Sequence, residues 1–325
     1  MNRKILVFTI FAIFIMISFL MFLVMYNFIR IVLHSLHEIS VSARIWQLTN
    51  GKLIKELMKD KDVEVVVFSP DGQYLAVYTS YGGIIWIYKT QNWQIKTKIL
   101  NAGFPYTNNS LVFVSNKILA ITDGKDIHLW TIQGQLIQTL KGHKSDVTAL
   151  ACSNSNNLLA SGSKDGQMLI WQIRGGKILR TIKSNSSITS LAFSSDDSQL
   201  LIATTKGIMA WSLKEQRYKW QLNLGEISHI IVKDSILAFT KHNEILLFDI
   251  NFLKKIHKIS HDSKIEDFAL SNDKRYIAFI DGIFTYVYDI NKKSLVWKSK
   301  ALLRPLCLDI SPNGLWIAVG YFIRK

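Results

Sequence analysis

An aromatic residue ends a short apolar run at seven nearly evenly spaced positions along the chain, and this period constrains the fold more than any other feature. The intervals are 40, 44, 41, 40, 37 and 40 residues, and alternating apolar residues precede the aromatics, as in the segments IHLW and MLIW. A repeat of this length built from short strands indicates an array of units that bury apolar faces against one another. The seven aromatic residues are Trp46, Trp86, Trp130, Trp171, Trp211, Phe248 and Tyr288.

Two further apolar runs belong to each unit and give an independent count, which is again seven. Turn-forming residues separate the first run from the second, as in Ser69-Pro70-Asp71-Gly72. The first runs begin near Val63, Ser110, Val147, Ile188, Ile227, Ile265 and Leu306. The second runs begin near Tyr74, Ile118, Leu158, Leu200, Ile236, Tyr276 and Leu315.

The most complete unit runs from Gly142 to Trp171. It contains a Gly-His pair, two apolar runs, a Lys-Asp-Gly turn and a third run that ends in the tryptophan. This unit resembles the WD repeat, a family whose repeats of about 40 to 45 residues fold as four-stranded blades of a β-propeller. The resemblance implies an all-β propeller. The aspartate of the family signature follows the aromatic only at Asp249 and Asp289, so the repeats are divergent.

The two ends of the repeat array complement each other. Residues 306–310 and 315–321 would form the first two strands of a last blade, and residues 42–48 and 52–57 would form a third and a fourth strand. We therefore predict that these four strands form one blade and close a seven-bladed ring, because closure removes the exposed sheet edges of an open array. The alternative is a truncated array with six complete blades and a frayed end.

Resemblance to the family implies a buried hydrogen-bond network in the third blade, formed by His143, Ser161, Asp165 and Trp171. The relay would run from the indole N–H through Ser161 to His143 and Asp165, which gives each buried polar group a partner. A Ser, a His and an Asp can also form a hydrolytic triad, but the sequence has no G-x-S-x-G nucleophile motif. His261 would hold a position like that of His143 before the first strand of the sixth blade.

Motifs for catalysis and cofactor binding are absent from the sequence. It has no phosphate-binding glycine loop, no H-E-x-x-H motif and no C-x-x-C pair. His34 and His37 stand one helical turn apart but lack a third ligand. The pairs Asp196-Asp197 and Glu266-Asp267 are interpreted as turn and rim residues. We therefore predict a protein that is not an enzyme and has no cofactor, no metal site and no small-molecule substrate.

The first part of the chain is apolar. Residues 5–29 carry no charge, which is long enough to span a bilayer, whereas the apolar region of a cleaved signal peptide is usually shorter. We therefore predict two parts: a transmembrane helix with a juxtamembrane segment in residues 1–39, and a propeller in residues 40–325. This organisation predicts a single-pass membrane protein. The flanking basic residues nearly balance, and the short basic N-terminal tail favours an extracytoplasmic propeller.

The chain is strongly basic, with a formal net charge of +15 from 39 Lys and Arg against 24 Asp and Glu. Such an excess can attract nucleic acid or anionic membranes. The basic residues are spread over the repeats, singly or in pairs such as Lys254-Lys255, and no run of five or six occurs. This scatter favours the interpretation that nucleic acid is not a partner.

The expected function is a membrane-anchored, non-catalytic scaffold that binds other proteins, because the loops of all blades of a propeller converge on one face. The expected binding face includes the loops at residues 144–146 and 184–187. One alternative is an extracytoplasmic enzyme or ligand binder that uses the central channel. It predicts titratable residues at the channel mouth, whereas the inner strands read as mostly Ser, Thr and apolar. Another alternative is a structural or assembly subunit of a larger membrane complex.

Overall fold

The computed structural model describes residue 25 and residues 42–105, 107–155, 157–300 and 304–322. The strands belong to one compact unit, Val41–Lys325. The predicted transmembrane segment, residues 5–29, lies outside the described residues apart from Met25. No helix in the described part of the chain has the length and apolar character needed to cross a bilayer.

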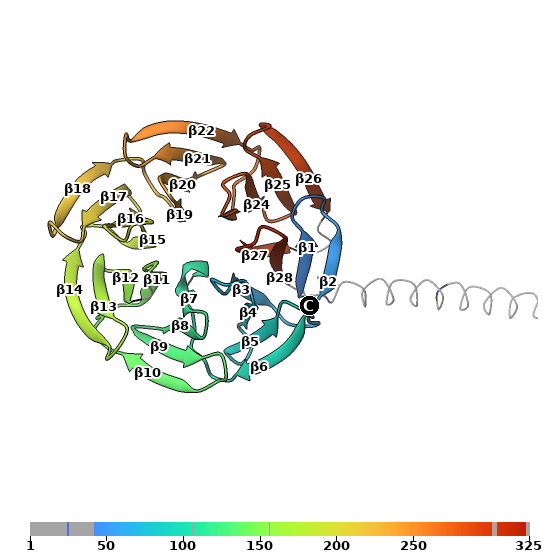
Figure 1. Ribbon diagram of the computed structural model, residues 1–325, viewed down its shortest axis with the longest axis horizontal. Helices are drawn as coiled ribbons and strands as arrows, with labels where there is room; N and C mark the ends of the chain where they lie inside the picture. Colours follow the sequence, from blue (N-terminus) through green and yellow to red (C-terminus); the bar gives the residue numbers. More distant parts are fainter. Residues whose placement is uncertain (1–24, 26–41, 106, 156, 301–303, 323–325) are drawn as a thin grey trace, which may run out of the picture. The chain divides into compact units, whose positions relative to one another are not determined.

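Among the described residues, twenty-eight strands form seven four-stranded antiparallel sheets, arranged as blades around a central axis (Figure 1). This confirms the predicted seven-bladed propeller. The first strands of blades 1 to 7 are β3 (Val63–Phe68), β7 (Leu111–Ser115), β11 (Val147–Cys152), β15 (Ile188–Phe193), β19 (Ile230–Lys233), β23 (Asp267–Leu270) and β27 (Arg304–Ile310). The second strands, in the same order, are β4 (Tyr74–Thr79), β8 (Ile118–Asp123), β12 (Leu158–Ser163), β16 (Gln199–Thr204), β20 (Ile236–Lys241), β24 (Tyr276–Ile280) and β28 (Trp316–Phe322).

The outer half of each blade follows the same pattern. The third strands of blades 1 to 7 are β5 (Ile84–Lys89), β9 (Asp126–Thr131), β13 (Gln167–Gln172), β17 (Gly207–Ser212), β21 (Glu244–Asp249), β25 (Phe284–Asp289) and β1 (Ala43–Gln47). The fourth strands are β6 (Gln94–Ile99), β10 (Leu136–Leu140), β14 (Lys177–Lys183), β18 (Arg217–Leu222), β22 (Lys254–Ser260), β26 (Ser294–Lys300) and β2 (Leu53–Glu56). A short 3-10 helix, η1 (Asn108–Ser110), precedes β7.

The seventh blade joins the two ends of the repeat array. Its strand order is β2-β1-β28-β27, and β1 pairs with β28 in the register Ala43↔Gly320 and Ile45↔Ala318. The neighbouring blade 6 is fixed to it by the Trp297 indole, which donates to the carbonyl of Leu48 at 2.7 Å. The predicted closure is therefore confirmed, and the alternative of six blades with a frayed end is wrong.

The hydrophobic core lies between neighbouring blades. One buried cluster joins Val65 and Tyr78 of blade 1 to Leu111 and Leu119 of blade 2. The second strands are buried on both faces because a blade covers each side. Each blade thus depends on its neighbours for burial, as expected of a repeat array.

The strand register corrects one of the seven aromatic positions. In blades 2 to 7 the predicted aromatic lies beside a β-bulge between the third and fourth strands, as Trp171 does opposite Ile178. In blade 1 the residue beside the bulge is Tyr88, opposite Ile95, whereas Trp86 lies two residues earlier. The prediction of Trp86 was wrong because residues two apart point to the same face of a strand, so both aromatics fit the pattern.

Candidate functional site

The third blade brings together three of the four residues expected in its network. The Trp171 indole donates to Ser161 Oγ at 2.8 Å, and His143 Nε2 lies 2.6 Å from the same oxygen. Asp165 instead accepts a hydrogen bond from Ser163 at 2.5 Å and one from the N–H of Gln167. The expected relay therefore ends at His143, and Asp165 shapes the turn.

Burial dominates the behaviour of His143. Desolvation lowers its pKa to about 4, although the Asp165 carboxylate opposes part of that shift. Its other ring nitrogen, Nδ1, is buried without a hydrogen-bond partner. Protonation would place a second N–H there without an acceptor, so the structure favours the neutral ring and argues against a hydrolytic base.

The sixth blade contains a second network that sequence reasoning missed in part. His261 Nε2 lies 3.0 Å from Asp281 Oδ2, and the Tyr286 hydroxyl donates to the same oxygen at 2.8 Å. Burial raises the pKa of Asp281, but hydrogen bonds from His261 and the backbone outweigh it and hold the pKa below its usual value. In the sequence, the turn-forming pair Asp281-Gly282 was the feature that could have indicated this carboxylate.

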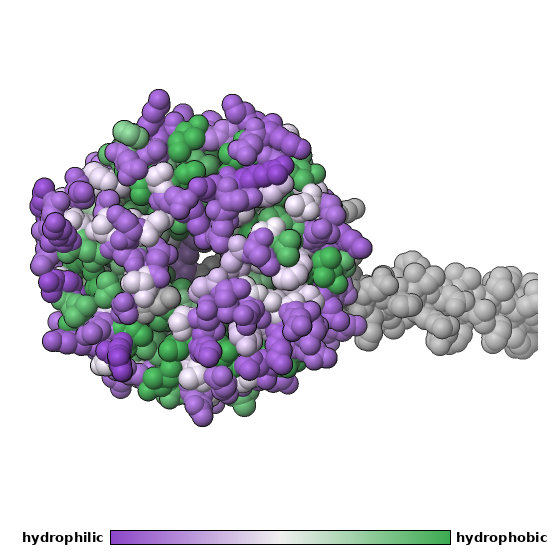
Figure 2. Space-filling model, in the orientation of Figure 1, coloured by the Kyte–Doolittle hydropathy of each residue, from purple (hydrophilic) through white to green (hydrophobic). Residues whose placement is uncertain are grey.

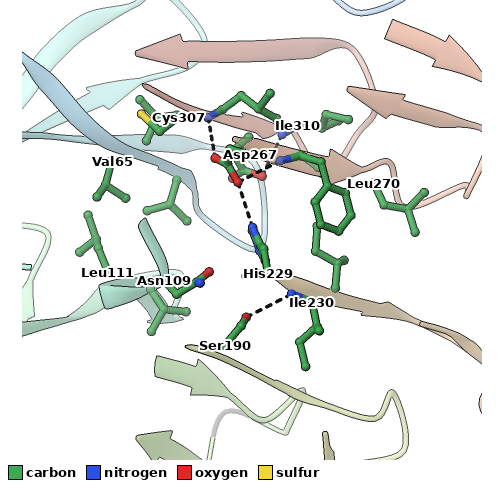
Figure 3. Close-up of a pocket in the computed structure, with 18 of the residues that line it drawn as sticks. Val65, Asn109, Leu111, Ser190, His229, Ile230, Asp267, Leu270, Cys307 and Ile310 are labelled. Carbon is green, nitrogen blue, oxygen red and sulfur yellow. Dashed lines mark hydrogen bonds and ion pairs between the residues drawn. The ribbon is translucent and has the colours of Figure 1, made fainter. Parts of the chain in front are cut away.

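The first strands of the blades surround a central cavity of about 240 Å³. Its wall contains charged groups that the sequence interpretation did not expect on inner strands: His229, Lys233, Asp267 and Asp309. The view of Figure 3 shows His229 directed towards Asp267 from the neighbouring strand. The titratable residues that a channel site requires are therefore present in this wall.

Asp267 connects three consecutive blades. Its Oδ1 lies 2.9 Å from His229 Nδ1, and its Oδ2 accepts the N–H of Leu308 at 3.1 Å (Figure 3). The residue is 3% exposed. The interpretation of Asp267 as a rim residue was wrong, because its carboxylate lies in the wall and satisfies backbone groups there. Its neighbour Glu266 does lie at the rim, where Arg304 pairs with it at 3.0 Å.

Asp309 makes the corresponding connection from blade 7 to blade 1. It accepts the N–H of Phe68 at 2.8 Å across the ring junction. Burial raises its pKa to about 6, and the hydrogen bond from Phe68 and the nearby Lys233 only partly oppose this. Burial lowers the pKa of Lys233 in turn, and its ammonium group donates to Asn272 Oδ1 at 2.7 Å. These groups hold blades together, so little of their hydrogen-bonding capacity is left for a ligand.

One end of the channel, which we call the acidic mouth, opens into a cavity of about 450 Å³. The loops that join fourth to first strands and second to third strands surround it. Asn109 of η1 reaches across this mouth and donates to the carbonyl of Thr189 at 3.0 Å. Ser187, from one of the two loops expected at the binding face, lies in its lining. The charged residues that line the mouth are Lys164, Glu226, His229, Glu266 and Asp267.

The opposite end of the channel, which we call the turn mouth, is formed by the turns between first and second strands. These turns bind one another: Asp197 accepts the N–H groups of Asn154 and Ser155, and Asn272 donates to the carbonyl of Pro312. Asp196 and Asp197 thus lie in a turn, as expected from the sequence. The turns of this mouth are thus cross-linked by hydrogen bonds between blades.

The described residues contain no group of three or more His, Cys, Asp or Glu side chains placed to hold a metal ion. The cavity of about 240 Å³ also lies below the range of roughly 300 to 1,000 Å³ usual for small-molecule sites. The cavities at the acidic mouth and the turn mouth, of about 450 and 590 Å³, lie within that range.

Comparison with known proteins identifies the repeats. Residues 134–172 and 176–212 match the family described as WD domain, G-beta repeat. The first match covers β10 to β13 and the second covers β14 to β17, so each repeat supplies the fourth strand of one blade and three strands of the next. This overlap interlocks consecutive blades.

Several curated proteins are similar to part of the chain. A periodic tryptophan protein 2 homolog of Schizosaccharomyces pombe is 38% identical over 97 residues, which are 29% of this chain and 11% of that protein. The small ribosomal subunit protein RACK1z of Arabidopsis thaliana is 40% identical over 82 residues, 25% of each chain. The U3 small nucleolar RNA-associated protein 15 homolog of Xenopus laevis is 32% identical over 101 residues, 30% of this chain and 20% of that protein. The matches thus span a quarter or less of these relatives.

These relatives overturn the predicted single-pass membrane localisation. One is named as a protein of the small ribosomal subunit and another as associated with U3 small nucleolar RNA, and neither name describes a membrane protein. The length of the apolar run and its basic flanks led to that prediction. The chain is therefore a seven-bladed β-propeller, and two of its segments, residues 134–172 and 176–212, are similar to the WD domain, G-beta repeat.

Proposed function

We propose that this propeller is a non-catalytic platform that binds another protein at the acidic mouth. The observation that carries the proposal is the difference between the channel wall and its opening. Asp267 and Asp309 in the wall are bound to backbone N–H groups of neighbouring blades. Glu226 at the mouth is exposed instead. An open carboxylate at the edge of a rigid concave surface favours a partner segment with a basic side chain.

The loops around the acidic mouth suit this role because a closed ring fixes their positions. The backbone N–H of Lys164 donates to the carbonyl of Asp146 at 3.0 Å, and that of Ser184 donates to the carbonyl of Gly166. These bonds join the loop between β12 and β13 to the loops that connect blade 3 to blades 2 and 4. A partner would therefore meet a preorganised surface, which lowers the entropic cost of binding.

The names of the relatives support a place in a larger assembly. The ribosomal subunit protein and the U3 small nucleolar RNA-associated protein are similar to this chain over 25% and 30% of its length. A propeller that joins components of an assembly needs binding surfaces and no catalytic group. We therefore extend the proposal to an adaptor subunit that holds proteins together, and we propose that it is not an enzyme.

The test uses a tagged full-length chain to isolate a partner, which is then purified and titrated by calorimetry. Glu226→Lys reverses the charge of the open carboxylate at the acidic mouth. We expect this variant to weaken binding at least tenfold, because like charges would face each other. The matched control is the double variant Asn251→Lys and Asn291→Lys, which changes net charge equally on exposed turns of the opposite face.

Two outcomes would count against the proposal. Equal loss of affinity in the control and in Glu226→Lys would show that net charge, rather than the acidic mouth, governs binding. Full affinity in Glu226→Lys would place the partner elsewhere on the propeller.

A further inference from the structure

Charge is segregated between the inside and the outside of the ring. The seven fourth strands hold thirteen Lys or Arg residues and one acidic residue, Glu56. The seven first strands hold two basic residues, Lys233 and Arg304, and three acidic ones. Basic residues recur on the fourth strands of six of the seven blades. They look scattered in the sequence, yet the fold collects them on the outer rim.

One strongly basic part of the rim lies where blades 3 and 4 meet. We call this surface the basic sector and define it by seven exposed side chains of β14, β18 and the turns before them. Tyr218 of β18 donates to the carbonyl of Lys183 in β14 at 2.8 Å, which fixes the two strands side by side. In Figure 2 the rim beyond β14 and β18 is largely hydrophilic. The seven residues are Arg174, Lys177, Arg180, Lys183, Lys214, Arg217 and Lys219.

These charges are poorly neutralised. Within the described residues, Glu215 is the one carboxylate in an ion pair with any of the seven, and it binds Arg217 at 2.7 Å. Neither β13 nor β17, the strands behind β14 and β18, carries a charged residue. The repulsion among the remaining cations is therefore relieved mainly by mobile counterions, which an anionic polymer can displace.

Protection of exposed sheet edges does not account for the sign of these charges. Charged side chains on an edge strand prevent pairing with other chains. Acidic residues would provide that protection too, yet thirteen of the fourteen charges on the fourth strands are positive. A uniform sign indicates an anionic partner.

The composition of the basic sector favours nucleic acid over an acidic protein. The cores of protein interfaces are depleted of charge and enriched in aromatic residues. Here the aromatic residues of β18 are turned inward: Tyr218 packs against Trp211 with ring centroids 4.9 Å apart, and Trp220 packs against the core between blades 4 and 5. Five of the eight exposed side chains of β14 and β18 are cationic, and the other three, Ile178, Thr181 and Gln221, are uncharged. This composition suits the evenly charged backbone of a nucleic acid.

We propose that the basic sector binds the phosphate backbone of a single-stranded nucleic acid. A single strand can follow the convex rim, whereas a duplex is stiff over this length. Binding is independent of base sequence, because no aromatic side chain of β14 or β18 is free to stack on a base. This surface lies on the circumference and is separate from the acidic mouth.

The test is fluorescence anisotropy of a labelled 20-nucleotide oligouridylate with the full-length protein between 50 and 200 mM salt. We expect binding that weakens steeply with salt. The variant Lys177→Glu, Arg180→Glu and Lys219→Glu should bind at least tenfold more weakly, and its log–log salt slope should fall by about 2 for three lost phosphate contacts. The matched control, Lys117→Glu, Lys125→Glu and Lys264→Glu, makes the same charge change at exposed turns and should bind within twofold of the wild type.

Equal loss in both triple variants would overturn the proposal, as would the absence of wild-type binding at 50 mM salt. Competition by polyglutamate as effective as that by unlabelled oligouridylate would also overturn it and indicate an acidic protein instead. Urea unfolding midpoints, together with the milder variant Lys177→Gln, Arg180→Gln and Lys219→Gln, separate lost binding from lost folding.

Discussion

Replacement of His143 by glutamine should flatten the pH dependence of stability. In the wild type the unfolded chain protonates this histidine near pH 6.5, whereas burial lowers the pKa in the folded protein to about 4. The folded pKa is depressed, so unfolding is favoured by proton uptake as the pH falls from 6.5 towards 4. Integration of this linkage between pH 7.5 and pH 5 gives a loss of about 2 kcal/mol of stability.

Glutamine lacks this titration but can still place an amide near Ser161. At pH 7.5 we expect His143→Gln to cost about 1 kcal/mol, because the hydrogen bond is replaced imperfectly. Between pH 7.5 and pH 5 the variant should lose about 2 kcal/mol less than the wild type. Urea unfolding followed by tryptophan fluorescence at both pH values measures this difference directly.

The pH dependence of the wild type alone does not isolate His143, because Asp309 changes stability with pH in the opposite direction. The variant is therefore compared with the wild type. Its raised pKa of about 6 stabilises the folded protein as the pH falls, and this offsets part of the loss at His143. His242→Gln, the same replacement at an exposed histidine, serves as the matched control. An unchanged slope in His143→Gln would refute the assignment of this titration to the buried ring.

Five further substitutions test the packing and the buried networks. Gly320→Ala in β28 should cost about 2 kcal/mol in urea unfolding, since its Cβ would meet Val63 Cγ1 at 2.4 Å. Gly142→Ala should cost less, because its Cβ would meet the ends of the Ile178, Trp171 and Leu169 side chains at 2.8 to 3.2 Å. Asp281→Ala should cost about 3 kcal/mol because it leaves His261 and Tyr286 without their acceptor, and Tyr286→Phe should cost about 1 kcal/mol in the same assay. Asp309→Asn should abolish a gain in stability of about 3 kcal/mol that the wild type acquires at this site between pH 7 and pH 3, as measured by unfolding at several pH values.

The sequence predicted the fold well because its repeat period is encoded in every blade. Independent counts of the apolar runs each gave seven units, and the strands at the two ends of the repeat array complement each other. Only a closed ring satisfies both observations, so closure could be predicted. The register within blade 1 was less accessible. Trp86 and Tyr88 fit the same strand pattern, and only the bulge opposite Ile95 distinguishes them.

The candidate site was harder to predict because its contacts connect different repeats. Asp267 binds the backbone of Leu308, and Asp309 binds that of Phe68, 241 residues away. No local sequence pattern predicts that a carboxylate will bind the backbone of another repeat. The available signal was physical: a carboxylate within an apolar strand is costly to bury unless a donor meets it. The basic rim could not be recognised in the sequence for a related reason. The fourth strands lie far apart along the chain, so their basic residues look scattered.

The central claim, that a protein partner docks at the acidic mouth, is tested most directly by site-specific photo-cross-linking in cells. A photoreactive residue at the exposed Thr205 lies at the acidic mouth, and one at Asn291 lies on a turn of the opposite face. We predict that Thr205 gives a cross-link to one discrete protein and that Asn291 does not. A cross-link to that protein from Asn291 alone, or equally from both positions, would contradict the claim.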